Sequence, residues 1–121
     1  MRYHFTFPIK CISKDNEKIF NRSGRFFTSK KFKDFEKTLQ FLFHQQRPPE
    51  FKMFEHEDLF VSLIFTFDSK VHCDLQNLPK GFLDAFQGEI YKNDRQIKSM
   101  TLDLYYGNEC RIDMNVQEMP K

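Results

Sequence analysis

Two short polar stretches in the second half of the chain carry side chains that can do chemistry. Residues 74–80 read DLQNLPK and combine an aspartate, two amides and a lysine. Residues 93–97 read NDRQI and add a second aspartate, Asp94. Carboxylates can hold a divalent cation, and a lysine can stabilise negative charge that develops on a phosphate. The rest of the chain reads as the scaffold that must position these groups.

A helix is expected to carry the first stretch. Its apolar positions recur at helical spacing and are Leu75, Leu78, Phe82 and Phe86. Pro79 lacks an N–H and is tolerated only in a first turn, so we expect the helix to begin between Leu75 and Leu78. Gly88 is the expected stop. Asp74 then falls at a loop-to-helix junction, and Asp94 falls in a polar turn just before a strand.

These positions also have plain structural interpretations. On sequence alone, the favoured interpretation of Asp74 is a helix N-cap and that of Asp94 is a turn residue. Lys80 is spaced for a helical ion pair with Asp84, which contributes about 0.3–0.5 kcal/mol. Asn77 is either a cap or a residue that orients Asp74 or contacts phosphate. Residue type and spacing alone therefore leave both interpretations open.

The two motifs together resemble the RusA family of Holliday-junction resolvases. The family signature is D-x-D-N-x-x-K-x-x-x-D-A-L followed by G-x-x-x-x-D-D-x-Q-I, and residues 74–86 and 88–97 read DLQNLPKGFLDAF and GEIYKNDRQI. Residues 24–29, GRFFTS, precede an amphipathic helix and resemble the family's basic approach to its first helix. The matches span most of the chain, from Tyr3 to Met119.

The resemblance implies a small dimeric endonuclease that binds four-way DNA junctions and cuts two strands symmetrically with Mg²⁺ or Mn²⁺. Residue by residue, Asp74 and Asp94 match catalytic, metal-binding aspartates, and Lys80 matches the catalytic lysine. Two positions depart from the pattern. Gln76 replaces the second aspartate, and Asn93 replaces the first residue of the Asp-Asp pair. We expect Gln76 to offer a neutral oxygen to the metal, so that activity survives with weaker metal affinity.

The basic charge is concentrated near the N-terminus. The first 33 residues hold nine Lys and Arg against two Asp and Glu, although the whole chain carries only +2. Lys and Arg that neutralise phosphates supply most non-specific DNA affinity. The expected DNA-binding residues are Arg22, Arg25, Lys30, Lys31, Lys33 and Asn77. A solvated charged loop is the alternative, and Phe20, Phe26 and Phe27 either stack on unpaired bases or, as we expect, join the core.

Length and composition predict one domain, residues 1–121, in a soluble intracellular protein. The three cysteines are scattered and read as free thiols of a reducing compartment. His72 beside Cys73 lacks the ligand count of a zinc site. No leader-like start or 18-residue apolar run is present, so we expect no membrane partner. A cytoplasmic protein encoded by a bacterium or phage is the setting associated with the resemblance.

Hydrophobic periodicity predicts an α+β fold, a mixed sheet with two packed helices in the order β-α-β-α-β-β. Alternating apolar residues indicate strands over 3–9, 59–67, 100–106 and 110–116. A helix after Thr28 or Ser29 ends before Arg47-Pro48-Pro49. Residues 10–25 are expected to form a long loop or a loose hairpin through 19–20 and 26–27. The last two strands are expected to pair as an antiparallel hairpin.

Two other functions stay open at this point. A DNA-binding module of the same fold would keep the basic surface and the dimer but would have lost cleavage through Gln76 and Asn93. An interaction protein without a nucleic-acid role would use the carboxylates as caps, and it would show no salt-dependent DNA affinity.

Overall fold

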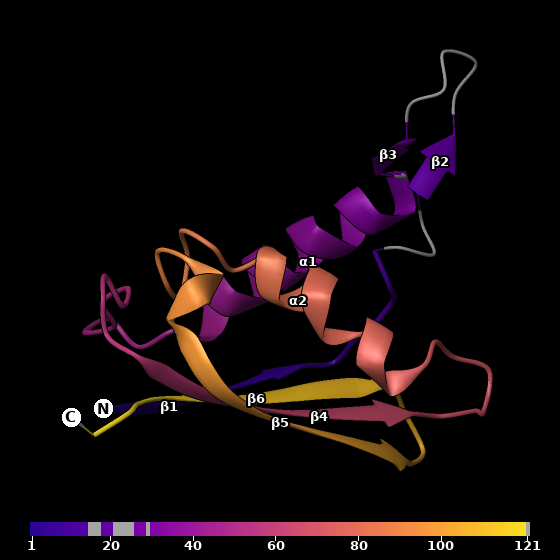
Figure 1. Cartoon of the computed structure of the whole chain (residues 1–121). Coiled ribbons are helices and arrows are strands. Elements are labelled where there is room, and N and C mark those ends of the chain that lie inside the picture. Colours follow the sequence, from indigo (N-terminus) through magenta and orange to yellow (C-terminus); the bar gives the residue numbers. More distant parts are fainter. Residues whose placement is uncertain (15–17, 21–25, 29, 121) are drawn as a thin grey trace.

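The computed structural model describes residues 1–14, 18–20, 26–28 and 30–120 (Figure 1). Its strands are β1 (Arg2–Phe7), β2 (Lys18–Phe20), β3 (Phe26–Thr28), β4 (Leu59–Phe67), β5 (Ile97–Tyr106) and β6 (Arg111–Glu118). Its helices are α1 (Lys30–Gln46) and α2 (Pro79–Asp84), with single 3₁₀ turns η2 (Leu75–Asn77) and η3 (Asp94–Gln96). Apart from the two short strands β2 and β3, the order of strands and helices is the predicted β-α-β-α-β-β.

The described residues form a four-stranded sheet in the order β1-β6-β4-β5 and a separate β2-β3 pair. Strand β5 runs parallel to β4, and β6 runs antiparallel to both β4 and β1. The sheet is therefore mixed, as predicted, but the predicted hairpin between the last two strands is wrong. Alternation reveals which face a strand buries and not which strand it pairs with. Here the crossover through α2 places β5 on one edge of β4, and β6 fills the other edge.

Both helices cover the same face of the sheet (Figure 1). Every second residue of β4, from Leu59 to Phe67, is buried on that face. The helix α1 buries Phe32, Phe35, Leu39 and Phe43 at helical spacing and ends one residue before Arg47, as the sequence predicts. Aromatic rings dominate the interior: Phe82 packs edge-on against Phe7 and Phe65. The opposite face of the sheet carries no helix in the described part of the chain.

The central helix is shorter than predicted. Residues Leu75–Asn77 form the turn η2, and Pro79 then occupies the first position of α2, where its missing N–H costs nothing. The helix ends at Asp84, and Gly88 adopts a left-handed φ of 84° within the turns that follow. The proline therefore divides the expected helix into two pieces, and Asp74 precedes the first of them.

Two smaller expectations are also resolved. The backbone of residues 18–20 pairs antiparallel with that of 26–28, which confirms the loose hairpin.

All three cysteines are free, and Cys11 is buried. Burial, reinforced by the neighbouring Cys73, raises the pKa of the Cys11 thiol well above its usual range. In the described ranges, no helix is long and apolar enough to span a bilayer.

The helix α2 sits very close to α1 because residue 81 is a glycine. A Cβ atom at Gly81 would lie 2.5 Å from Cζ of Phe32 and 2.9 Å from Cβ of Lys14. Phe32 is itself fully buried, so its ring has little room to move away. Contact between the two helices thus requires a residue without a side chain at this position.

We predict that Gly81→Ala destabilises the fold by about 1–3 kcal/mol through overpacking, as measured by urea unfolding. Helix propensity alone predicts the opposite sign, since Ala is favoured over Gly by about 1 kcal/mol inside a helix. An unchanged or raised unfolding free energy would show that α1 and α2 are not in this close contact.

Candidate functional site

Asp74 lies at the end of the loop that follows β4, immediately before η2. Its backbone is extended, with φ −60° and ψ 144°, and it occupies the N-cap position of η2. Its side chain makes no capping hydrogen bond in the described structure, and the residue is exposed. The capping role that sequence alone favoured is therefore not what holds this carboxylate in place.

Gln76 shares a hollow with Asp74. The hollow has a volume of about 370 Å³ and is lined by Asp74, Leu75, Gln76 and Leu102. Strand β5 contributes Leu102 to its lining, η2 contributes Leu75 and Gln76, and Asp74 directly precedes η2. A carboxylate side chain and an amide side chain, the first pair of candidate metal ligands, therefore border one open space together with two leucines.

Asp94 lies in η3, where its neighbours supply the cap. The Asn93 side chain accepts a hydrogen bond from the Arg95 N–H at 2.9 Å, and the Gln96 side chain accepts one from the Asn93 N–H at 2.9 Å. This is a reciprocal cap of the kind that closes helix N-termini. Asp94 thus lies in a turn, as predicted, but the side chains that cap this turn are those of Asn93 and Gln96.

Gln96 is a supporting residue whose role the sequence left unassigned. It is buried, and its amide donates to the carbonyl oxygens of Phe54 and Glu57 at 3.2 and 3.1 Å. The Gln87 side chain adds a further bond by accepting from the Asp94 N–H at 3.0 Å. A glutamine three residues after a capping asparagine is the sequence signal for this arrangement. These bonds anchor η3 against the segment that leads into β4.

One chain does not bring Asp74 and Asp94 together. Asp94 is the first residue of η3, which leads directly into β5 at Ile97. Asp74 instead shares its hollow with Leu102, which lies five residues further along β5 than Ile97. At about 3.3 Å per residue, that length of strand spans roughly 16 Å. Figure 1 shows the same separation, with η2 and the start of β5 at opposite ends of α2. The described residues accordingly contain no group of three or more acidic, His or Cys side chains that could hold a metal ion.

The remaining residues of the motif lie along η2 and α2. Lys80 is exposed in the first turn of α2, and Asn77 is half-buried with its N–H bonded to the Asp74 carbonyl at 2.9 Å. Asp84, which is spaced for a helical pair with Lys80, also contacts the Lys14 ammonium at 3.5 Å. Asn77 thus contributes to η2 through its backbone.

The expected DNA-binding residues lie partly in the described structure. Lys30, Lys31 and Lys33 are exposed in the first turn of α1, which contains no acidic residue. Arg22 and Arg25 fall outside the described residues, and so do the side chains of Phe20, Phe26 and Phe27. The three lysines therefore provide the described part of the basic surface.

Comparison with known proteins bears on this arrangement. A search of the curated proteins finds no match to the chain. The family model for endodeoxyribonuclease RusA matches residues 8–117, a range that contains η2, α2, η3 and both aspartates. Since the match covers nearly the whole chain, the protein belongs to the RusA endodeoxyribonuclease family.

Proposed function

We propose that the protein is a structure-specific endodeoxyribonuclease that resolves four-way DNA junctions by metal-dependent phosphodiester hydrolysis. The observation that carries the proposal is the exposure and hydrogen bonding of the Asp74 carboxylate. Its carboxylate is exposed beside Gln76 in a hollow, on the family's motif, and it makes no capping bond. A carboxylate held at a turn without a structural bond of its own is suited to a ligand.

The candidate metal ligands Asp74, Gln76 and Asp94 have the oxygen atoms that Mg²⁺ or Mn²⁺ prefers, but a single chain does not bring all three together. Carboxylate and amide oxygens are appropriate for these ions, and Mg²⁺ requires its ligands at about 2.0–2.1 Å. Asp74 and Gln76 border one hollow, but Asp94 lies in η3, beyond the other end of α2. A single chain therefore does not fit a site that uses both aspartates.

A symmetric dimer would bring all of the candidate metal ligands together. If Asp94 of a second copy approaches Asp74 of the first, two-fold symmetry makes the reverse contact as well, and two equivalent sites result. Strand β5 suits such an interface, because it is an edge strand of the sheet that the described residues form and its Met100 is 40% exposed. Antiparallel apposition of two β5 edges places the start of one strand beside the end of the other. Two sites also match the two symmetrical cuts that junction resolution requires.

The remaining residues take roles that follow from their positions. A bound metal ion would supply an activated water and would neutralise charge on the phosphate. Asp74 and Gln76 would orient the reacting centre at the hollow, and Lys80 would present its ammonium to a phosphoryl oxygen. Asn77 would contact the DNA backbone near the same turn.

The lysines of α1 support a DNA-binding role. Lys30, Lys31 and Lys33 lie at the positive end of the helix dipole, where each cation costs about 0.3–1 kcal/mol. Three exposed cations at this end of a helix suit a surface that meets phosphates. Arg22 and Arg25 are proposed to extend the surface.

A non-catalytic junction-binding module is the second candidate function. It rests on two departures from the family motif, Gln76 and Asn93, that suggest loss of the cleavage activity, and one observation gives Asn93 another explanation. Its side chain caps η3 through Arg95, so an uncharged amide serves a structural role there. Gln76 is then the remaining departure that bears on cleavage.

We predict that the wild type introduces paired symmetrical nicks in a labelled four-way junction with Mg²⁺ or Mn²⁺, and none with EDTA or on duplex of the same sequence. Asp74→Asn should slow cleavage by about 10²-fold or more while junction binding is retained. Glu50→Gln is the control, because it removes one carboxylate charge from an exposed position in the loop after α1, away from the candidate site and from β5. Tight binding without scission in either metal would identify a junction-binding module. No salt-dependent DNA affinity would exclude both functions.

We also predict that Gln76→Asp lowers the metal concentration needed for half-maximal cleavage, because it adds a charged oxygen to the Asp74 hollow. A shift of about tenfold corresponds to one additional ligand interaction of about 1.4 kcal/mol. Metal titration at saturating junction provides the measurement, and Gln117→Asp is the control. An unchanged midpoint for Gln76→Asp would show that residue 76 does not face the metal.

A further inference from the structure

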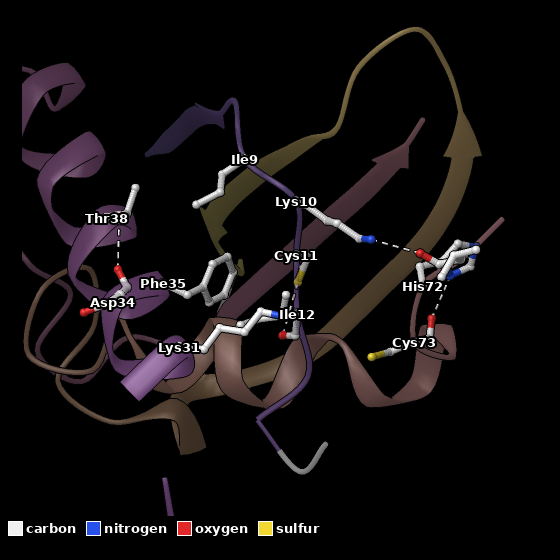
Figure 2. Close-up of a pocket in the computed structure, with 11 residues that line it drawn as sticks. Ile9, Lys10, Cys11, Ile12, Lys31, Asp34, Phe35, Thr38, His72 and Cys73 are labelled. Atoms are coloured by element: carbon white, nitrogen blue, oxygen red, sulfur yellow. Dashed lines mark hydrogen bonds between the residues drawn. The ribbon is translucent and has the colours of Figure 1, made fainter. Parts of the chain in front are cut away.

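The loop between β4 and Asp74 is held by side chains from other parts of the chain. The ammonium of Lys10, just beyond β1, donates to the Val71 carbonyl at 2.9 Å, and Figure 2 shows its side chain reaching across to this loop. The Gly107 N–H, just beyond β5, bonds the carbonyl of Phe67 at 3.0 Å, where the loop begins. The loop is thus fixed at both its start and its middle.

His72 fixes the last part of the loop. Its ring stacks on Phe67, with a centroid distance of 4.3 Å and an interplanar angle of 12°. Its Nδ1 lies 2.8 Å from the Cys73 carbonyl oxygen (Figure 2), and its Nε2 lies 2.8 Å from the Tyr106 hydroxyl. The ring therefore has a contact on its face and a hydrogen bond at each nitrogen.

These partners determine which nitrogen of the neutral ring carries the proton. A carbonyl oxygen only accepts hydrogen bonds, so the nitrogen facing Cys73 must be Nδ1–H. Nε2 is then the acceptor, and the Tyr106 hydroxyl donates to it. The network runs from the end of β5 through His72 to the peptide carbonyl that directly precedes Asp74.

The direction of the chain at Asp74 depends on this network. Asp74 makes no capping bond of its own, so its place is determined by the peptide before it and by the Asn77 N–H that bonds its carbonyl. His72 holds the preceding peptide, and Tyr106 holds His72. Tyr106 belongs to the same strand as Leu102, which lines the Asp74 hollow.

We propose that His72 and Tyr106 are positioning residues that orient Asp74 for the nuclease reaction. The proposal rests on the proposed function of Asp74. Neither residue touches the hollow itself, so both act through the Cys73 peptide. Their loss should affect the step that needs a well-placed carboxylate more than it affects DNA binding, since small misplacements of a catalytic group reduce rates strongly.

Tyr106 and its neighbour make the proposal testable without unfolding the protein. Tyr106 is 54% exposed and Tyr105 is 57% exposed, and the two project from opposite faces of β5. Tyr106→Phe removes only the hydroxyl that bonds His72, and Tyr105→Phe removes the same atom from the other face. The pair therefore separates the hydrogen bond from the general effect of losing a tyrosine hydroxyl.

We predict that Tyr106→Phe slows single-turnover junction cleavage by about tenfold with unchanged junction affinity, and that Tyr105→Phe matches the wild type. Among His72 variants, His72→Asn places an amide N–H where Nδ1–H was and should retain part of the rate. His72→Phe keeps the stacking but loses both hydrogen bonds and should be slower. A rate for His72→Phe equal to that of His72→Asn would overturn the role of the Cys73 bond.

Nuclear magnetic resonance of the metal-free protein tests the geometry independently of activity. The ¹⁵N signals of His72 should report the Nδ1–H form, and Tyr106→Phe should shift the amide signals of Cys73 and Asp74 while Tyr105→Phe does not. An Nε2–H form, or equal shifts from both variants, would overturn the proposal. If the wild type does not cleave junctions, the proposed function fails, and these signals still decide whether His72 and Tyr106 position Asp74.

Discussion

The parallel pairing of β4 with β5 is the constraint on which the rest of the structure depends. Two parallel neighbours need a crossover connection that returns the chain to the starting end of the sheet. Here η2 and α2 form that crossover over the face that also holds α1. Asp74 lies where the crossover begins and Asp94 where it ends. The same connection that places both aspartates on one side of the sheet therefore keeps them apart within a chain.

Close packing holds this short crossover in place. Gly81 lets α2 contact Phe32 of α1, and Phe82 packs against rings from β1 and β4. At the far end, the Tyr91 hydroxyl donates to the Leu83 carbonyl. Burial raises the pKa of Tyr91 well above its usual value, and the negative charges of Asp94 and Asp84 add to the effect. The hydroxyl thus stays neutral as a donor. Each polar turn that carries an aspartate is therefore attached to a rigid interior.

Sequence predicted the local features and missed those that depend on distant contacts. The alternation through β4 and the helical spacing in α1 are local patterns, and both are confirmed. The pairing of β6 between β1 and β4 was missed, because alternation does not encode a partner. In the site, the motif identified Asp74 and Gln76, which do share a hollow. It gave no indication that Asp94 lies at the other end of α2, because spacing along a chain does not determine convergence in space.

The most direct test of this account is to mix two inactive variants, Asp74→Asn and Asp94→Asn, and to assay four-way junctions. If the sites are shared between two chains, each mixed dimer retains one intact pair of aspartates. A 1:1 mixture should then recover about a quarter of the wild-type sites and nick one strand of a junction. Mixing Asp74→Asn with the double variant, which leaves no intact pair, should stay inactive. A mixture of the two single variants that is as inactive as either alone would contradict the account and place both aspartates of each site in one chain.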